Sequence, residues 1–121
     1  MANPNIVNVT SIYGKTLGAA LTTSSADILT NTAASGKILK VNTVLVSNID
    51  GTDNATVDVL FYDASVSTSF YIAEVVVVPA ASTLKVVTKD AFLYLEEGDK
   101  IAALASAADD LQIIISYEEI S

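Results

Sequence analysis

The stretch "FYIAEVVVVPAASTLKVV", residues 70–87, decides how the rest of this sequence is interpreted. Its first half is rich in aromatic and β-branched residues, a composition typical of β-strands. Pro79 ends the run, because proline cannot donate a hydrogen bond to a strand ladder. Val75 to Val78 is apolar on both faces, whereas an antiparallel strand commonly keeps one face for water. We therefore predict that one face packs on the core and that another subunit covers the other face.

Strict alternation along residues 70–78 defines two apolar faces. One face carries Tyr71, Ala73, Val75 and Val77. The other carries Phe70, Ile72, Val76 and Val78, and Glu74 interrupts it. We predict that Phe70, Ile72, Val76 and Val78 form the oligomer or particle interface. In the alternative, these four form the core face, and Tyr71 and Val75 lie at the interface.

Similar short apolar runs, separated by turn residues, fill the remaining chain. The expected strands are residues 6–13, 18–23, 38–48, 55–62, 70–78, 83–88, 91–95, 100–106 and 111–118. Residues 23–37 are expected to form a loop or one helical turn. The pattern predicts a single all-β domain over residues 1–121, an antiparallel β-sandwich or jelly roll of about eight or nine strands. Residues 1–12 are interpreted either as an extended arm on a neighbouring subunit or as a frayed terminus.

Composition excludes several classes of function. The chain has no Cys and no His, and all six basic residues are Lys. Imidazole and thiolate metal sites and a His general base are therefore ruled out, and we expect no cofactor and no enzyme activity. The net charge of −8 disfavours binding to nucleic acid or to an anionic membrane. The first ten residues lack the basic and apolar regions of a signal peptide, and no apolar run has the ~20 residues that cross a bilayer.

Two acidic clusters are the remaining candidates for chemistry. "DGTDN", residues 50–54, has carboxylates at spacings that could hold Ca²⁺, but it lacks the other alternating ligands and the distal Glu. "LEEGDKI", residues 95–101, places Glu96, Glu97 and Asp99 around Gly98, and paired carboxylates can perform acid–base catalysis. We interpret both as turns, the second as a solvated hairpin tip, and predict no metal site and no catalytic residue.

Four segments carry a resemblance to a known group of proteins. They are "SIYGKT" (11–16), "LTTSSADILTN" (21–31), "VSNIDGTDNATVDVLFYDAS" (46–65) and "LYLEEGDKIAALASAADDLQIIISYEEIS" (93–121). In these segments the chain resembles small virion structural proteins of tailed phages, namely cyanophages and related phages that infect marine bacteria. "LEEGDKI" also resembles a hairpin that is frequent in trimeric jelly rolls. The resemblance implies a non-enzymatic structural protein of the virion, made in the host cytoplasm.

Within that group we expect an oligomeric capsid decoration protein, most simply a trimer bound to itself and to the major capsid protein. The first alternative is a tail, fibre or neck protein that contributes to host attachment. A more remote alternative is a carbohydrate-binding module, which the absence of Trp disfavours.

Overall fold

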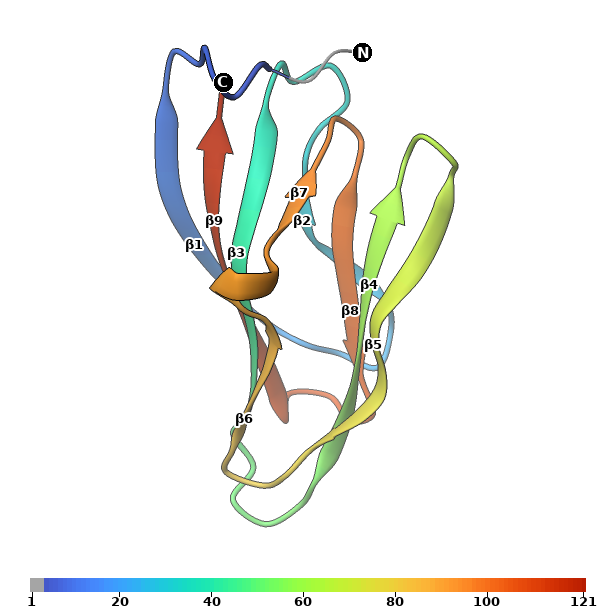
Figure 1. Ribbon diagram of the computed structural model, residues 1–121. Helices are drawn as coiled ribbons and strands as arrows, with labels where there is room; N and C mark the ends of the chain where they lie inside the picture. The colour runs from blue at the N-terminus through green and yellow to red at the C-terminus, as the bar shows by residue number, and fades with distance from the viewer. Residues whose placement is uncertain (1–3) are drawn as a thin grey trace.

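The computed structural model describes residues 4–121, which form nine strands and one turn of 3-10 helix (Figure 1). The strands are β1 (Ile12–Ala20), β2 (Ala26–Thr30), β3 (Ile38–Asn48), β4 (Ala55–Asp63), β5 (Thr68–Val78), β6 (Thr83–Val87), β7 (Leu93–Leu95), β8 (Lys100–Ala105) and β9 (Leu111–Ile120). The 3-10 turn, Lys89–Ala91, separates β6 from β7. The predicted all-β fold is thus confirmed.

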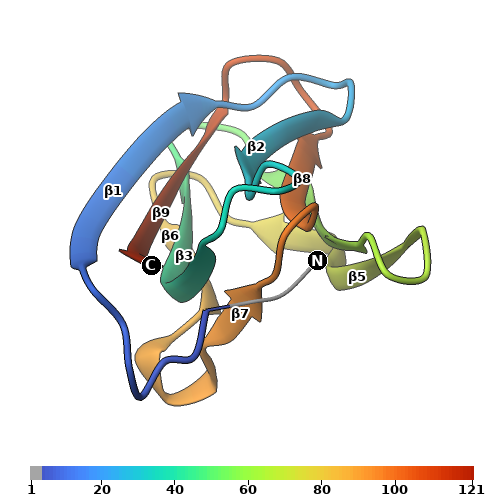
Figure 2. The ribbon, with the colours of Figure 1, turned by 90° about the horizontal axis from the view of Figure 1, so that it is seen from above.

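The strands form two antiparallel sheets that pack face to face as a sandwich (Figure 2). One sheet has the order β1-β9-β3-β6, with β7 also paired to β3, and the other has the order β2-β8-β4-β5. Strand β1 pairs with β9, β2 with β8, β3 with β6 and β7, and β4 with β5. This nested pairing, in which one long hairpin is rolled up, is the jelly-roll topology.

The core consists almost entirely of aliphatic side chains from the inner faces of both sheets. Alternation in β4 buries Val57 and Val59, and alternation in β9 buries Ile113 and Ile115. β-branched residues favour this arrangement because they fit the half-buried surface of a pleated strand. Tyr117 continues the β9 face and packs partly against the core. These two strands therefore face as their sequence pattern predicted.

Two buried asparagines hold the loops at the two ends of the sandwich. The Asn48 side-chain amide donates to the carbonyls of Asp53 and Val78, at 3.0 and 2.9 Å. The Asn31 amide donates to the carbonyls of Lys37 and Leu95, both at 2.9 Å. Each amide satisfies backbone carbonyls from two separate segments, so that neither loop leaves these groups unpaired in the interior.

The predicted strand boundaries were wrong near the N-terminus. The expected strand at residues 6–13 is absent, and β1 instead begins at Ile12 and runs through Gly14 and Gly18. The segment expected to be a loop or helical turn contains β2. Both strands have weak intrinsic β propensity and form because β9 and β8 provide the hydrogen-bonding edges beside them.

Residues 4–11 lie across the end of the sheet where β9 terminates (Figure 2). The backbone N–H groups of Thr10 and Ser11 both donate to the carbonyl of Ser121, at 2.7 and 3.0 Å. This part of the chain is therefore attached to its own subunit. Ile6 and Val7 are exposed. Residues 1–3 of the predicted arm lie outside the described residues, and its contact with a neighbouring subunit stays a prediction.

Candidate interaction surface on the β2-β8-β4-β5 sheet

Strand β5 forms one edge of its sheet and pairs irregularly with β4. Tyr71 lies opposite Leu60 and Ala73 opposite Val59, so Ile72 is an extra residue between them. A second irregularity follows, because Glu74 and Val75 together face the single residue Asp58. Such bulges bend a strand and increase its twist.

The second bulge depends on one hydrogen bond. Val75 adopts a left-handed backbone conformation, with φ of 49°, which is unfavourable for a β-branched residue. Its N–H donates to the Asp58 carboxylate at 2.6 Å. A charged acceptor makes this a strong hydrogen bond that offsets the strained conformation. Asp58 therefore sets the shape of the β5 edge.

The residues predicted to form an interface lie mostly on the core side. Val78 is fully buried, opposite Ala55, so its assignment to an interface was wrong. Ile72 and Val76 are half-buried and pack against the core. Phe70 lies opposite Phe61 near the end of the strand and remains 51% exposed. Val76 and Val78 face the core because Val57 and Ala55, the β4 residues with which they pair, point into it.

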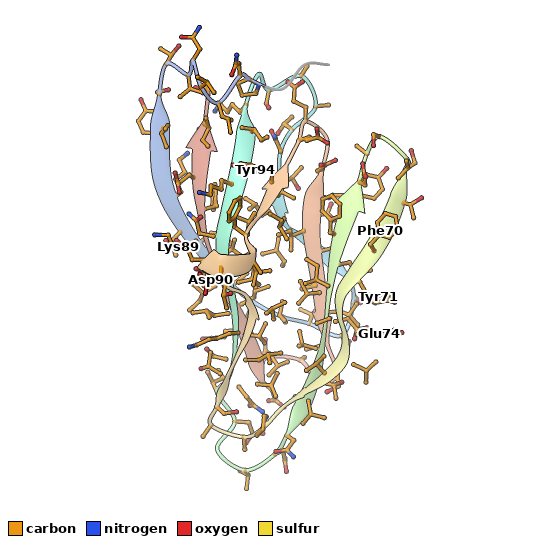
Figure 3. The ribbon with its side chains drawn as sticks, viewed as in Figure 1. Phe70, Tyr71, Glu74, Lys89, Asp90 and Tyr94 are labelled. Atoms are coloured by element: carbon orange, nitrogen blue, oxygen red, sulfur yellow. The ribbon has the colours of Figure 1, made fainter. Side chains whose placement is uncertain are left out.

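The exposed apolar side chains of β5 are those named in the alternative. Tyr71 is 55% exposed, Val75 61% and Val77 52%. Tyr71 and Val77 pair with Leu60 and Thr56, which alternate with the buried residues of β4 and so lie on the outer face of the sheet. In Figure 3, Tyr71 and Glu74 lie on the side of the molecule away from Lys89 and Asp90.

Apolar residues continue from β5 across the outer face of the sheet. Leu60 of β4 lies between Tyr71 of β5 and Ala102 of β8, and Leu104 lies opposite Asp58. The apolar residues among these are all at least partly accessible to solvent: Leu60, Tyr71, Ala102 and Leu104. We call the set of outward apolar residues the outer apolar face. It consists of Leu60, Tyr71, Val75, Val77, Ala102 and Leu104.

Charged groups border the outer apolar face. The Lys100 amine lies 3.1 Å from the Asp27 carboxylate and 5.0 Å from the centre of the Tyr62 ring. The outer face of the other sheet has a different character, because most of its cross-strand pairs are polar. These polar pairs are Lys40–Glu118, Thr43–Ser116 and Ser47–Gln112. The Leu45–Ile114 pair is the apolar exception on that face, and Ile114 is 38% exposed, so the two outer faces differ in how much apolar surface they present.

The acidic turn of residues 95–101 was predicted to be a solvated hairpin tip, and this was wrong for two of its three carboxylates: Glu97 and Asp99 are buried, whereas Glu96 is exposed. Asp99 is 2% exposed, and its two carboxylate oxygens accept from the N–H groups of Ala64 and Glu96, each at 2.9 Å. The Glu97 carboxylate accepts from the N–H of Gly36 at 2.6 Å. These two carboxylates thus join loops from three parts of the chain. Their burial is explained by these hydrogen bonds, which hold the loops together.

Gly98 is required at this turn for two reasons. Its φ is +89°, a conformation that residues with a side chain rarely adopt. A Cβ atom at this position would also lie 2.9 Å from the Cβ of Ala64, which is too close.

The turn at residues 50–54 has the predicted turn character. The Asp50 carboxylate accepts from the N–H groups of Thr52 and Asp53, at 2.9 and 3.3 Å. These hydrogen bonds, that to Thr52 most of all, lower the pKa of Asp50 below its ordinary value. Within residues 4–121, no group of three or more Asp and Glu side chains is arranged to hold a metal ion. No helix in the described part of the chain is long and apolar enough to cross a membrane.

An aromatic cluster lies beside the 3-10 turn, across the molecule from β5. The Phe92 and Tyr94 rings are 5.5 Å apart in an edge-to-face arrangement, and the Lys40 amine lies 4.4 Å from the centre of the Phe92 ring. Phe92 is 42% exposed.

Comparisons with known proteins identify the fold. No protein-family model matches the chain, and no curated protein matches it. A solved structure described as "Bacillus endospore appendages form a novel family of disulfide-linked pili" is similar, with a TM-score of 0.51 and 15% sequence identity. The match covers 98% of this chain and 95% of that chain. At this identity the likeness shows a shared fold alone.

Proposed function

We propose that this chain is a non-enzymatic structural subunit of a tailed-phage virion, most specifically an oligomeric capsid decoration protein. The observation that carries the proposal is the outer apolar face, which has the character of a contact surface on the sandwich. The resemblance of four sequence segments to phage virion proteins supplies the kind of particle. The likeness to a pilus structure supports the same general class, a β-sandwich that serves as a structural protein.

Association through the outer apolar face has a clear driving force. Full burial of a large apolar side chain is worth about 1.5–3 kcal/mol relative to exposure. Tyr71, Val75 and Val77 each retain more than half of their surface in the single subunit. Burial of these three against a partner would therefore contribute several kcal/mol, although the loss of free motion opposes association. We expect a homo-oligomer, most simply a trimer, that buries this face.

Any assembly of this chain must be held together without disulfides. The similar pilus structure is described as disulfide-linked, and this chain contains no cysteine. Non-covalent contacts such as those of the outer apolar face must therefore hold the subunits together, whereas disulfides link the similar pili.

The chemistry of the chain agrees with a structural role. Asp99 and Glu97 are the most buried carboxylates, and both accept backbone hydrogen bonds between loops. Their hydrogen bonds therefore give both carboxylates a role in holding the loops together. The acidic, arginine-free surface suits the outside of a capsid, because packaged DNA lies inside.

Cryo-EM of virions purified from the phage that encodes this chain tests the proposal. Density for the sandwich on the capsid surface, at hundreds of copies by quantitative mass spectrometry, is the expected result. A few dozen copies or fewer at the tail or neck would instead favour the alternative. Absence of the chain from the particle would overturn both.

The contact surface can be tested on the isolated protein. Tyr71→Glu together with Val77→Glu should abolish association through the outer apolar face and so lower the mass of the oligomer, while the melting temperature of the subunit stays close to its original value. Thr83→Glu together with Lys85→Gln on β6 is the matched control, since it makes the net charge more negative by the same amount at two exposed positions of another strand. Light scattering of the three proteins gives the masses, and an unchanged mass for the first variant would contradict the assignment.

A further inference from the structure

The sandwich has four lateral strand edges, and three of them are irregular in the described residues 4–121. The β5 edge carries two bulges. The β2 edge has five residues and a register shift between Asp27 and Leu29. The edge beyond β3 is divided between the short strands β6 and β7, with a register shift between Val44 and Leu45. Bulges and short strands are the features that prevent an edge from pairing with another chain.

The β1 edge has none of these features. All nine residues from Ile12 to Ala20 pair with β9 in one continuous register, without a bulge and without proline. The strand lies at the outer margin of its sheet, and no described segment is paired to its free side (Figure 1). A long, regular and unpaired edge is a template for a further strand.

The unpaired backbone groups of β1 can be identified from its pairing with β9. Ser11 and Ser121 exchange both backbone hydrogen bonds, each at 3.0 Å, so this is a hydrogen-bonded pair of the ladder. Because such pairs alternate along an antiparallel ladder, the odd-numbered residues of β1 bond to β9. The even-numbered residues direct their N–H and C=O groups to the free edge. These residues are Ile12, Gly14, Thr16, Gly18 and Ala20.

Small side chains leave this edge accessible. Gly14 has open space where a Cβ would stand, and a Cβ at Gly18 would make only ordinary contacts at 3.8 and 4.0 Å. A shallow hollow lies beside the second half of the strand, lined by Gly18, Ala19, Ala20, Gln112, Ile113 and Ile114. From Gly14 onward, the residues that direct backbone groups to the free edge thus carry small side chains or none, whereas Ile12 and Tyr13 at the start of the strand are exposed.

We propose that β1 pairs antiparallel with β1 of a second copy of this chain, around a two-fold axis at Thr16. We assign the partner as a second copy of this chain because a long regular edge pairs best with another long regular edge. Among the described edge strands, β1 alone has such an edge. In this register Thr16 lies opposite the partner's Thr16, Gly14 opposite the partner's Gly18, and Ile12 opposite the partner's Ala20. Every outward N–H of both strands then has an acceptor, and the two β1-β9-β3-β6 sheets become one continuous sheet.

Charge does not oppose this pairing. The only charged residue of β1 is Lys15, and its amine lies 3.2 Å from the Glu119 carboxylate of the same chain. Lys15 is opposite the partner's Leu17 in the proposed register, so the two lysines do not face each other directly. The contact lies on a different strand and a different sheet from the outer apolar face, so one subunit can use both surfaces.

Cysteine cross-linking tests the register, because the chain has no cysteine of its own. Thr16→Cys should form an intermolecular disulfide under mild oxidation, since Cα atoms of a hydrogen-bonded pair are about 5.5 Å apart. Gly14→Cys alone and Gly18→Cys alone should not, because identical residues would be separated by four positions, about 13 Å. A mixture of these two variants should cross-link. Self-linking of Gly14→Cys, or no linking of Thr16→Cys, would overturn the proposal.

Proline substitution tests the contact without a new thiol. Thr16→Pro removes an N–H that points to the free edge, a position at which edge strands tolerate proline. It should halve the mass measured by analytical ultracentrifugation with little change in melting temperature. Leu17→Pro is the control, because its N–H belongs to the β9 ladder, and it should lower the melting temperature. A wild type and a Thr16→Pro variant of equal mass would refute the pairing, whatever the location of the chain in a particle.

Discussion

Replacing Val77 and Val78 separately with Ala tests which face of β5 packs on the core. The two residues are chemically identical neighbours in one strand, so their intrinsic strand propensities are the same. Val78 is fully buried opposite Ala55, whereas Val77 is 52% exposed opposite Thr56. The same substitution therefore measures burial and little else.

The expected magnitudes differ by a factor of about three. Val→Ala removes two carbon atoms, worth about 1.6 kcal/mol when both are buried. At Val78 the cavity adds to this loss, and we expect a destabilisation of about 2–3 kcal/mol. At Val77 about half of the surface is already in water, which limits the loss to about 0.8 kcal/mol. For 121 residues, 1 kcal/mol corresponds to about 4 °C in melting temperature.

Chemical and thermal unfolding at low protein concentration, where the subunits are separate, gives both values. Val78→Ala should lower the melting temperature by about 8–12 °C, and Val77→Ala by about 3 °C or less. At high concentration the effect of Val77→Ala should increase, because association buries the outer apolar face. Equal losses, or a larger loss at Val77, would mean that β5 faces the other way, as a shift of one residue would produce.

Three further predictions concern the carboxylates. Asp99→Ala should cost about 2–3 kcal/mol in urea unfolding, because two partly buried backbone N–H groups lose their acceptor. A loss below 1 kcal/mol would contradict the structural role of Asp99. The pKa of Glu119 is lowered, first by the hydrogen bond from Lys37 and then by Lys15, so its contribution to stability is complete above its ordinary pKa of about 4.3 and is lost as the pH falls through the lowered value. Stability measured from pH 6 to pH 3 should therefore fall more in the wild type than in Glu119→Gln, and parallel curves would refute this assignment. A calcium chelator should leave the melting temperature unchanged, because Asp50 is engaged by backbone N–H groups, and a drop of many degrees would reveal an essential metal.

Much of the local structure could be predicted from the sequence. The strand expected at residues 38–48 is observed with the same bounds, because a long run of β-branched residues is bounded by clear turn residues. The turn at Asp50 is also determined locally, since its carboxylate bonds to N–H groups two and three residues away. The predictions failed for residues whose hydrogen-bonding partner is distant in the sequence. Asp99 is buried because it accepts from Ala64, 35 residues earlier, and no short-range pattern encodes such a contact.

The amino-acid sequence by itself determined that this chain is an all-β sandwich without thiol or imidazole chemistry and that its strand at residues 70–78 is apolar on both sides. Only the tertiary structure decided which side of that strand faces the core. Alternation gives two sets of residues but does not say which set is inside, and the bulges of β5 interrupt the alternation. At the second bulge the Val75 N–H donates to the Asp58 carboxylate, 17 residues earlier in the chain. The facing of a strand is a property of its pairing, and pairing is established only when distant segments meet.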